Sequence, residues 1–285
     1  MFMRKKILIL AALLGILASA SAQESPATDT LATNRFVMRS TLYGVGCANL
    51  LDTYLSPVEY TGVEARIVHE RMRMTKLLDG NVSKQSLLQV NFGYTENRSE
   101  TGNELFGLVN WSCGLHYHFH INDHLTLLAG GLGEMNMGFI YNTRNSNNPA
   151  QAKAYVNLTA SGMAIYKFRL WNRPFAVRYQ LNVPMVGVMF SPQYQQSYYE
   201  IFTLGNSDGT VKLTSLHNQP SCRQLLTLDI PTRSVTYRIG YVGDFQQSRV
   251  NGIKCHTYSH TFMVGLVKRF YLIKPGDKSN SRFPF

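Results

Sequence analysis

The sequence predicts an all-β protein, a transmembrane antiparallel β-barrel of about twelve strands, with ten as the alternative. Three observations predict it. Apolar and polar residues alternate along many segments, as in residues 88–95 and 175–182, and a β-strand points successive side chains to opposite faces. An export signal begins the chain. After this signal, no uninterrupted apolar stretch approaches the roughly 20 residues of a membrane helix, so a mature chain that spans lipid must do so as a closed barrel.

The first 22 residues have the three parts of a secretory signal peptide. A basic head, residues 4–6, precedes an apolar run over residues 7–17, and Ala20-Ser21-Ala22 supplies small residues for cleavage after Ala22. The apolar run is too short for a spanning helix. Residues 23–35 are rich in Ser, Thr, Ala and Pro, so we expect a disordered leader there.

The barrel is expected over residues 36–273, followed by a basic periplasmic tail over residues 274–285. The expected strands are 36–47, 62–77, 84–96, 105–121, 124–141, 153–168, 175–190, 222–230, 233–245 and 257–273. Residues 197–204 and 210–217 are either a further hairpin, which gives twelve strands, or one excursion outside the barrel, which gives ten.

The turns predict how the barrel is oriented. On the twelve-strand count, the turns after even-numbered strands are short. The segments after strands three, five and eleven, which are residues 97–103, 142–150 and 246–255, are longer and polar. Bacterial barrels keep short turns in the periplasm and long loops outside. We therefore expect an outer-membrane location with both termini periplasmic and aromatic rings at both lipid–water interfaces. A soluble β-sandwich would also alternate, but its strands are usually shorter, at about five or six residues.

Several polar residues fall on the inward phase of the strands and are expected to line the lumen. Charged side chains in this position either set the selectivity of a narrow pore or pair with one another and plug a small barrel. The expected role is thus a narrow pore or binding barrel, or a structural membrane component, rather than an enzyme. The candidate lumen residues are Gln89, Asn157, Arg178, Gln180, Arg238 and Asp244.

Charge and composition limit the partners that we expect. The net charge of +11 falls to +8 when Arg4, Lys5 and Lys6 leave with the signal peptide. A basic surface suits membrane lipid and the phosphates of lipopolysaccharide, or a small solute. No nucleic-acid-binding motif is present, and export argues against that role. The sequence leaves the oligomeric state open.

Histidines and cysteines offer weaker candidates. His116 and His118 share one face of a strand and form a weak candidate metal site, but no Cys or carboxylate completes a ligand set, so no cofactor is expected. Four cysteines follow the signal peptide, and their pairing is open. Cys47 and Cys255 lie near the same end of the first and last strands, so a disulfide could join them across the closing seam.

The runner-up function is a lipid-modifying outer-membrane hydrolase. Ser215, His217 and Asn218 lie close together, and a serine beside a histidine with a polar orienting group is the arrangement of a nucleophilic hydrolase. Ser259 and His260 form a second such pair.

Two short motifs carry a resemblance to a known family. Residues 51–62 read LDTYLSPVEYTG, and residues 191–194 and 197–200 read SPQY and SYYE. With the barrel pattern, these resemble a family of uncharacterised outer-membrane β-barrel proteins, a domain of unknown function, from Bacteroides-type bacteria. The resemblance covers nearly the whole mature chain and implies location and fold, but no activity, cofactor or catalytic residue.

Overall fold

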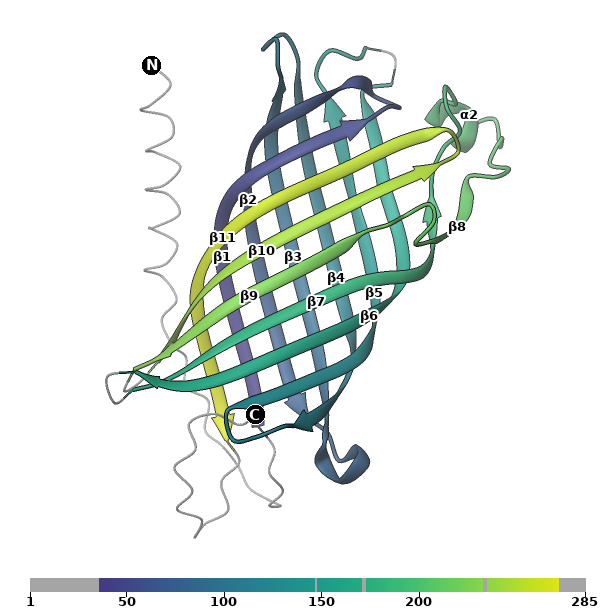
Figure 1. Cartoon of the computed structure of the whole chain (residues 1–285). Coiled ribbons are helices and arrows are strands. Elements are labelled where there is room, and N and C mark those ends of the chain that lie inside the picture. The colour runs from purple at the N-terminus through teal and green to yellow at the C-terminus, as the bar shows by residue number, and fades with distance from the viewer. Residues whose placement is uncertain (1–35, 147, 171–172, 233–234, 272–285) are drawn as a thin grey trace. The chain divides into compact units, whose positions relative to one another are not determined.

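The computed structural model describes residues 36–146, 148–170, 173–232 and 235–271. The expected signal peptide, leader and basic tail lie outside these residues. Within them, ten antiparallel strands close into a ring, and one further short strand lies on the wall (Figure 1). The ring strands are β1 (Phe36–Asp52), β2 (Ser56–Met74), β3 (Val82–Asn97), β4 (Asn103–His120), β5 (Leu125–Asn142), β6 (Ala150–Leu170), β7 (Arg173–Phe190), β9 (Cys222–Pro231), β10 (Thr236–Val250) and β11 (Ile253–Tyr271).

Each strand pairs with its neighbours in sequence, and two pairings complete the ring. The first strand pairs with the last, with Phe36 opposite Tyr271 and Asp52 opposite Cys255. β7 pairs on one side with β6 and on the other with β9 and β8. Among the described residues, every strand of the ring is therefore paired with a neighbouring strand on both sides. This pairing satisfies the requirement for a β-structure in lipid. The predicted antiparallel barrel is confirmed.

The wall next to β7 differs from the sequence expectation. Residues 197–204, considered for a strand, instead contain the short helix α2 (Tyr198–Phe202). The Ser197 hydroxyl accepts a hydrogen bond from the Glu200 N–H, and the Glu200 carboxylate accepts one from the Ser197 N–H, so a capping box begins the helix. β8 (Val211–Ser215) follows it and pairs with β7 alone. The closed ring thus has ten strands, the alternative count, and not twelve.

The strands are longer than the sequence pattern suggested. Apart from β9, each ring strand has 15 to 21 residues, whereas about 9–11 cross a bilayer at a tilt. The expected loop over residues 246–255 is wrong, because β10 and β11 continue to a two-residue turn at Asn251-Gly252. Both turn residues have positive φ, 51° and 77°, which is the type I′ geometry favoured by Asn-Gly.

The two faces of the wall have opposite character. On the outside, Phe92 is 57% and Leu158 is 65% exposed, while their neighbours Asn91 and Asn157 are 6% and 1% exposed. Aromatic rings lie exposed near both ends of the strands, as in Tyr94 at one end and Tyr166 at the other, where two interfacial girdles were expected. Among the described residues, neither helical segment has the length and apolar character to cross a bilayer.

We call the end of the ring where β1 joins β2 the loop end, and the opposite end the terminal end. The loop end carries the excursion that contains α2 and β8, whereas the terminal end carries the 3-10 turn η1 (Leu77–Gly80) between β2 and β3 (Figure 1).

Candidate functional site in the barrel interior

A network of buried ion pairs crosses the middle of the ring. Arg66, on β2, is 2% exposed, and its Nη1 lies 3.0 Å from Asp244 Oδ2 on β10, three strands away around the ring. Its Nε lies 3.2 Å from Glu64 Oε1. Nη2 donates to the Ser259 hydroxyl at 2.7 Å, and Nη1 donates to the Gln89 carboxamide oxygen at 3.1 Å. One guanidinium therefore joins three separate parts of the wall.

A second arginine extends this network toward the opposite wall. Arg223 Nε lies 3.1 Å from Asp244 Oδ2, so Asp244 is shared between Arg223 and Arg66. The Nη1 group of Arg223 donates to Glu134 Oε1 at 2.6 Å. Because β9 and β5 supply these two partners, the contact spans the bore.

A third cluster surrounds Glu70, which is 1% exposed. Arg178 donates to both carboxylate oxygens of Glu70 at 2.7 Å, a bidentate pair. Arg238 donates to Glu70 Oε2 at 2.9 Å, and its Nε and Nη2 also donate to Asp229 at 2.6 and 3.0 Å. Gln85 donates to Glu70 Oε1 at 2.6 Å. Glu70 thus holds two arginines that come from β7 and β10.

Apolar side chains also pack inside the ring. Three buried clusters are formed by Met38, Met72, Leu128, Met163, Ile165 and Val267, by Leu42, Val68, Leu87, Leu225, Val242 and Met263, and by Ala48, Leu50, Leu55, Tyr60, Phe106 and Ile140. A void of about 10 Å³ lies beside the charged network, which is room for about one water molecule. The middle of the ring is packed rather than open.

All six expected lumen residues are buried, at 1 to 8% exposure. Three of them, Arg178, Arg238 and Asp244, are ion-paired as described above, and the carboxamides of Gln89 and Gln180 have hydrogen-bond partners. The Asn157 carboxamide is the exception, because neither its oxygen nor its nitrogen has a partner. The sequence argument did not single out the other buried charged residues, which are Asp52, Glu64, Arg66, Glu70, Glu104, Glu134, Arg223 and Asp229.

The period of two could have identified several of these missed residues. Glu64, Arg66 and Glu70 share one phase of β2, and all three are buried. What the sequence does not contain is their pairing, because Arg66 and Asp244 are 178 positions apart.

The candidate metal residues are each engaged with a serine. His116 and His118 are 0% and 3% exposed, and the Nε2 atoms of their rings lie 2.8 Å from the hydroxyls of Ser161 and Ser83. The two histidines thus contact different strands, since Ser161 lies on β6 and Ser83 on β3. No group of three or more potential ligands that could hold a metal ion occurs among the described residues.

The two serine–histidine pairs differ in geometry. Ser259 is buried and bonded to Arg66, whereas His260 lies on the outside, with its Nδ1 2.6 Å from the Tyr241 hydroxyl. Adjacent strand residues face opposite sides, so Ser259 and His260 cannot act together. Ser215 Oγ does lie 2.5 Å from His217 Nδ1.

Asn218, the proposed orienting group for the Ser215–His217 pair, makes its hydrogen bonds to other groups. Its side chain accepts from the Ser215 N–H and donates to the Leu213 carbonyl. These bonds stabilise the turn that follows β8, and they leave the His217 ring without an amide to orient it.

The Cys47–Cys255 disulfide, which the sequence left open, does not form. Cys47 lies opposite His260 in the register, whereas Cys255 lies opposite Asp52, five residues further along β1. At about 3.3 Å per residue, the offset far exceeds the roughly 7 Å that a disulfide spans between Cα atoms. Cys47 is also exposed while Cys255 is buried, and all four cysteines have free thiols.

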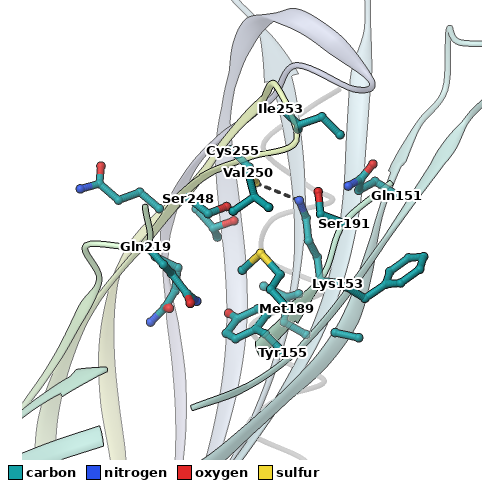
Figure 2. A pocket seen from close by; sticks show the side chains of 16 residues that line it. Gln151, Lys153, Tyr155, Met189, Ser191, Gln219, Ser248, Val250, Ile253 and Cys255 are labelled. Atoms are coloured by element: carbon teal, nitrogen blue, oxygen red, sulfur yellow. Dashed lines mark hydrogen bonds between the residues drawn. The ribbon is translucent and has the colours of Figure 1, made fainter. Parts of the chain in front are cut away.

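A cleft of about 50 Å³ opens in the interior near the loop end, and we call it the cup (Figure 2). Lys153 and Tyr155 of β6, Met189 of β7 and Cys255 of β11 contribute to its lining, and Gln219 reaches it from the excursion. The cup is the larger of the two cavities described, and it lies apart from the small central void.

A closed antiparallel ring with an apolar outer wall and a charge-paired interior defines a transmembrane β-barrel of the outer-membrane type. The chain belongs to the family described as "Protein of unknown function (DUF3316)", whose model matches residues 6–277. The resemblance to a barrel family of unknown function is thereby confirmed. Among curated proteins, none matches the chain in sequence.

Several solved structures of outer-membrane proteins are similar to this chain. The transport unit of the autotransporter AIDA-I from Escherichia coli is 9% identical with a TM-score of 0.47, over 93% of this chain and 97% of that one. The outer membrane protease OmpT from Escherichia coli is 7% identical with a TM-score of 0.46, over 86% and 100%. An outer membrane channel from Pseudomonas putida F1 is 8% identical with a TM-score of 0.36, over 87% and 100%. Likeness at this level carries no information about activity.

Proposed function

We propose that this protein is a closed outer-membrane barrel that does not conduct ions and that acts at the cell surface as a binding barrel. The single observation that carries the proposal is the filled bore. Four buried arginines meet five buried carboxylates across it, so little charge is left unpaired to attract a passing ion. The remaining void there has room for about one water molecule.

The proposal includes export by residues 1–22 and insertion with both termini in the periplasm, in a Bacteroides-type bacterium. The loop end then faces outward, where its partners are lipopolysaccharide and a small solute. One feature supports this orientation, and another supports the insertion into lipid. The excursion of residues 191–221, by far the longest connection between ring strands, lies at the loop end, and bacterial barrels place long loops outside. The exposed apolar wall suits contact with lipid.

Planar-bilayer recordings test whether the barrel is closed. We expect no stepwise conductance from the purified protein, with an open porin as the positive control. A pore would instead show steps, and these would change when Arg178 and Arg238 are replaced by Ala, because their charges would face the permeating ion. Reproducible steps from protein whose folding is verified by its gel mobility with and without heating would disprove the closed-barrel proposal.

The contact between Ser215 and His217 keeps the lipid hydrolase as a second candidate. This pair follows the outward-facing residues Val211 and Leu213 of β8, so it borders the lipid-facing wall. Phospholipid vesicles with calcium provide the assay. Fatty-acid release that is lost in Ser215→Ala would establish the hydrolase. We expect the wild-type protein to release no more fatty acid than Ser215→Ala does, and that result would exclude the hydrolase.

A further inference from the structure

The cup near the loop end is lined by both polar and apolar side chains, and the polar ones come from widely separated parts of the chain. Gln151 and Lys153 lie on β6, Gln246 and Ser248 on β10, and Gln219 in the excursion. Figure 2 shows Lys153, Tyr155, Met189 and Ser191 among the side chains that line the cavity. Carboxamides and hydroxyls therefore surround a space that communicates with the outer end of the ring.

The charges in the cup compensate each other. The Lys153 ammonium lies 2.5 Å from Asp52 Oδ2, and Lys153 Nζ lies 2.9 Å from Cys255 Sγ. An ammonium has three N–H donors, so one remains for a ligand. Because Asp52 already neutralises the positive charge, the cup offers an anion no uncompensated cation. This arrangement favours a neutral ligand that has a hydrogen-bond acceptor.

Among the residues that the structure describes, two carboxamides in the cup have an oxygen atom without a hydrogen-bond partner. Gln151 is 3% exposed, and its Oε1 makes no hydrogen bond. Gln246 donates to Asp244 through Nε2, but its Oε1 also makes none. A buried polar atom without a partner is costly, so both positions are suited to a ligand that donates. A hydroxyl group both donates and accepts, which means that it fits either orientation of a carboxamide.

Aromatic rings supply the apolar part of the lining. Tyr155 and Phe190 both border the cavity. The Phe190 ring is supported from behind by Phe202 of α2, with the ring centroids 6.3 Å apart and nearly parallel. A volume of about 50 Å³ has room for a few water-sized groups, so part of a ligand enters while the rest stays in the open mouth.

We infer that the cup binds a neutral polyhydroxyl ligand, through the hydroxylated edge of a sugar ring. The inference rests on the proposed function as a binding barrel, and it adds the chemical class of the ligand. Gln151 and Gln246 accept from the sugar hydroxyls, the free N–H of Lys153 donates to a hydroxyl oxygen, and Tyr155 contacts the C–H face of the ring.

Saturation-transfer NMR on the full-length mature barrel in detergent micelles tests this inference. The probes are glucose, galactose and mannose as neutral sugars, with glucuronate and glucosamine as charged counterparts. We expect saturation transfer to at least one neutral sugar, and binding at least tenfold weaker for the charged analogue of a neutral sugar that binds. Absence of transfer to all three neutral sugars, or equal binding of glucuronate, would overturn the inference.

Matched glutamine variants locate the ligand. Gln151→Leu and Gln246→Leu each remove an acceptor from the cup and are expected to weaken binding of the neutral sugar at least tenfold. Gln193→Leu, at an exposed position outside the cup, should leave it unchanged. Sugar binding that persists unchanged in both folded cup variants would overturn the site. Conductance measured on the same preparation tests the closed bore separately, because steps would refute the closed barrel whether or not a sugar binds.

Discussion

Replacing the carboxylate at the centre of the Glu70 cluster should be among the most damaging conservative changes in this barrel. In Glu70→Gln, the Arg178 guanidinium loses both of its 2.7 Å contacts to an anion, and it has no other ion-pair partner among the described residues. Arg238 keeps Asp229 at 2.6 Å, so it remains paired. Breaking a buried ion pair by removing one partner costs about 3–5 kcal/mol. We expect the free energy of unfolding to fall by that amount.

Urea unfolding of the barrel refolded in lipid vesicles, followed by tryptophan fluorescence, measures this loss. Glu59→Gln is the matched control, because Glu59 is exposed and makes a 3.3 Å contact with Asn49. The control should change stability by less than about 0.5 kcal/mol. If Glu70→Gln costs less than about 1 kcal/mol, well below the cost of an unpaired buried charge, then the interior network is more hydrated than its geometry implies, and the reasoning fails.

A double substitution separates the ion pair from its surroundings. When Glu70 and Arg178 are both replaced by Leu, no unpaired charge is left between them. Residues in contact typically couple by about 0.5–3 kcal/mol. We therefore expect the double variant to lose less stability than the sum of the two single variants, and simple additivity would show that the two side chains act independently.

Two further perturbations address the wall and the loop end. Gly93→Ala should cost about 1–3 kcal/mol through overpacking, because the added Cβ would collide with the Phe106 ring. Gly162→Ala, with open space around it, should be neutral. Equal urea midpoints for the two variants would contradict this. The Tyr54 hydroxyl donates to the Gln196 carbonyl at 2.8 Å, and burial raises the pKa of Tyr54 to about 12. The stabilising effect of the protonated Tyr54 hydroxyl is therefore complete below about pH 10 and is lost as the pH rises through 12. The difference in unfolding free energy between the wild type and Tyr54→Phe should shrink from pH 9 to pH 11.5, and a constant difference would count against it.

The alternation of residues indicates which side chains share a face of a strand, but not what they contact. The face to which a side chain points follows from its position in the sequence, because a strand has a period of two. This pattern places Arg178 and Arg238 on the inner face. Their common partner, Glu70, depends on how many strands close the ring and with what stagger, which no local pattern contains. The same limit explains the Cys47–Cys255 expectation, because strand ends were estimated without the register.

Strand ends and the excursion were predicted less well, for two physical reasons. Polar residues toward Val250 look like a loop, yet they continue β10 beyond the length needed to cross lipid. Residues 197–204 were considered either for a strand or for part of an excursion, although Ser197 and Glu200 carry the spacing of a capping box, which begins a helix. The Asn251-Gly252 pair was likewise a readable hairpin signal.

On one side of β7, the pairing with β9 stops before the pairing with β8 begins, and this break affects how the wall opens. Residues 176–182 of β7 are zipped to β9 and residues 186–190 to β8, so residues 183–185 between them have no ladder partner on that side. Pro184, which has no N–H to contribute, sits in this interval, and a register shift follows it on the β6 side. We expect thermal fluctuations to separate the strands of the barrel first at this interval. Amide hydrogen exchange would record this opening as a short run of rapidly deuterated positions between slowly exchanging ones.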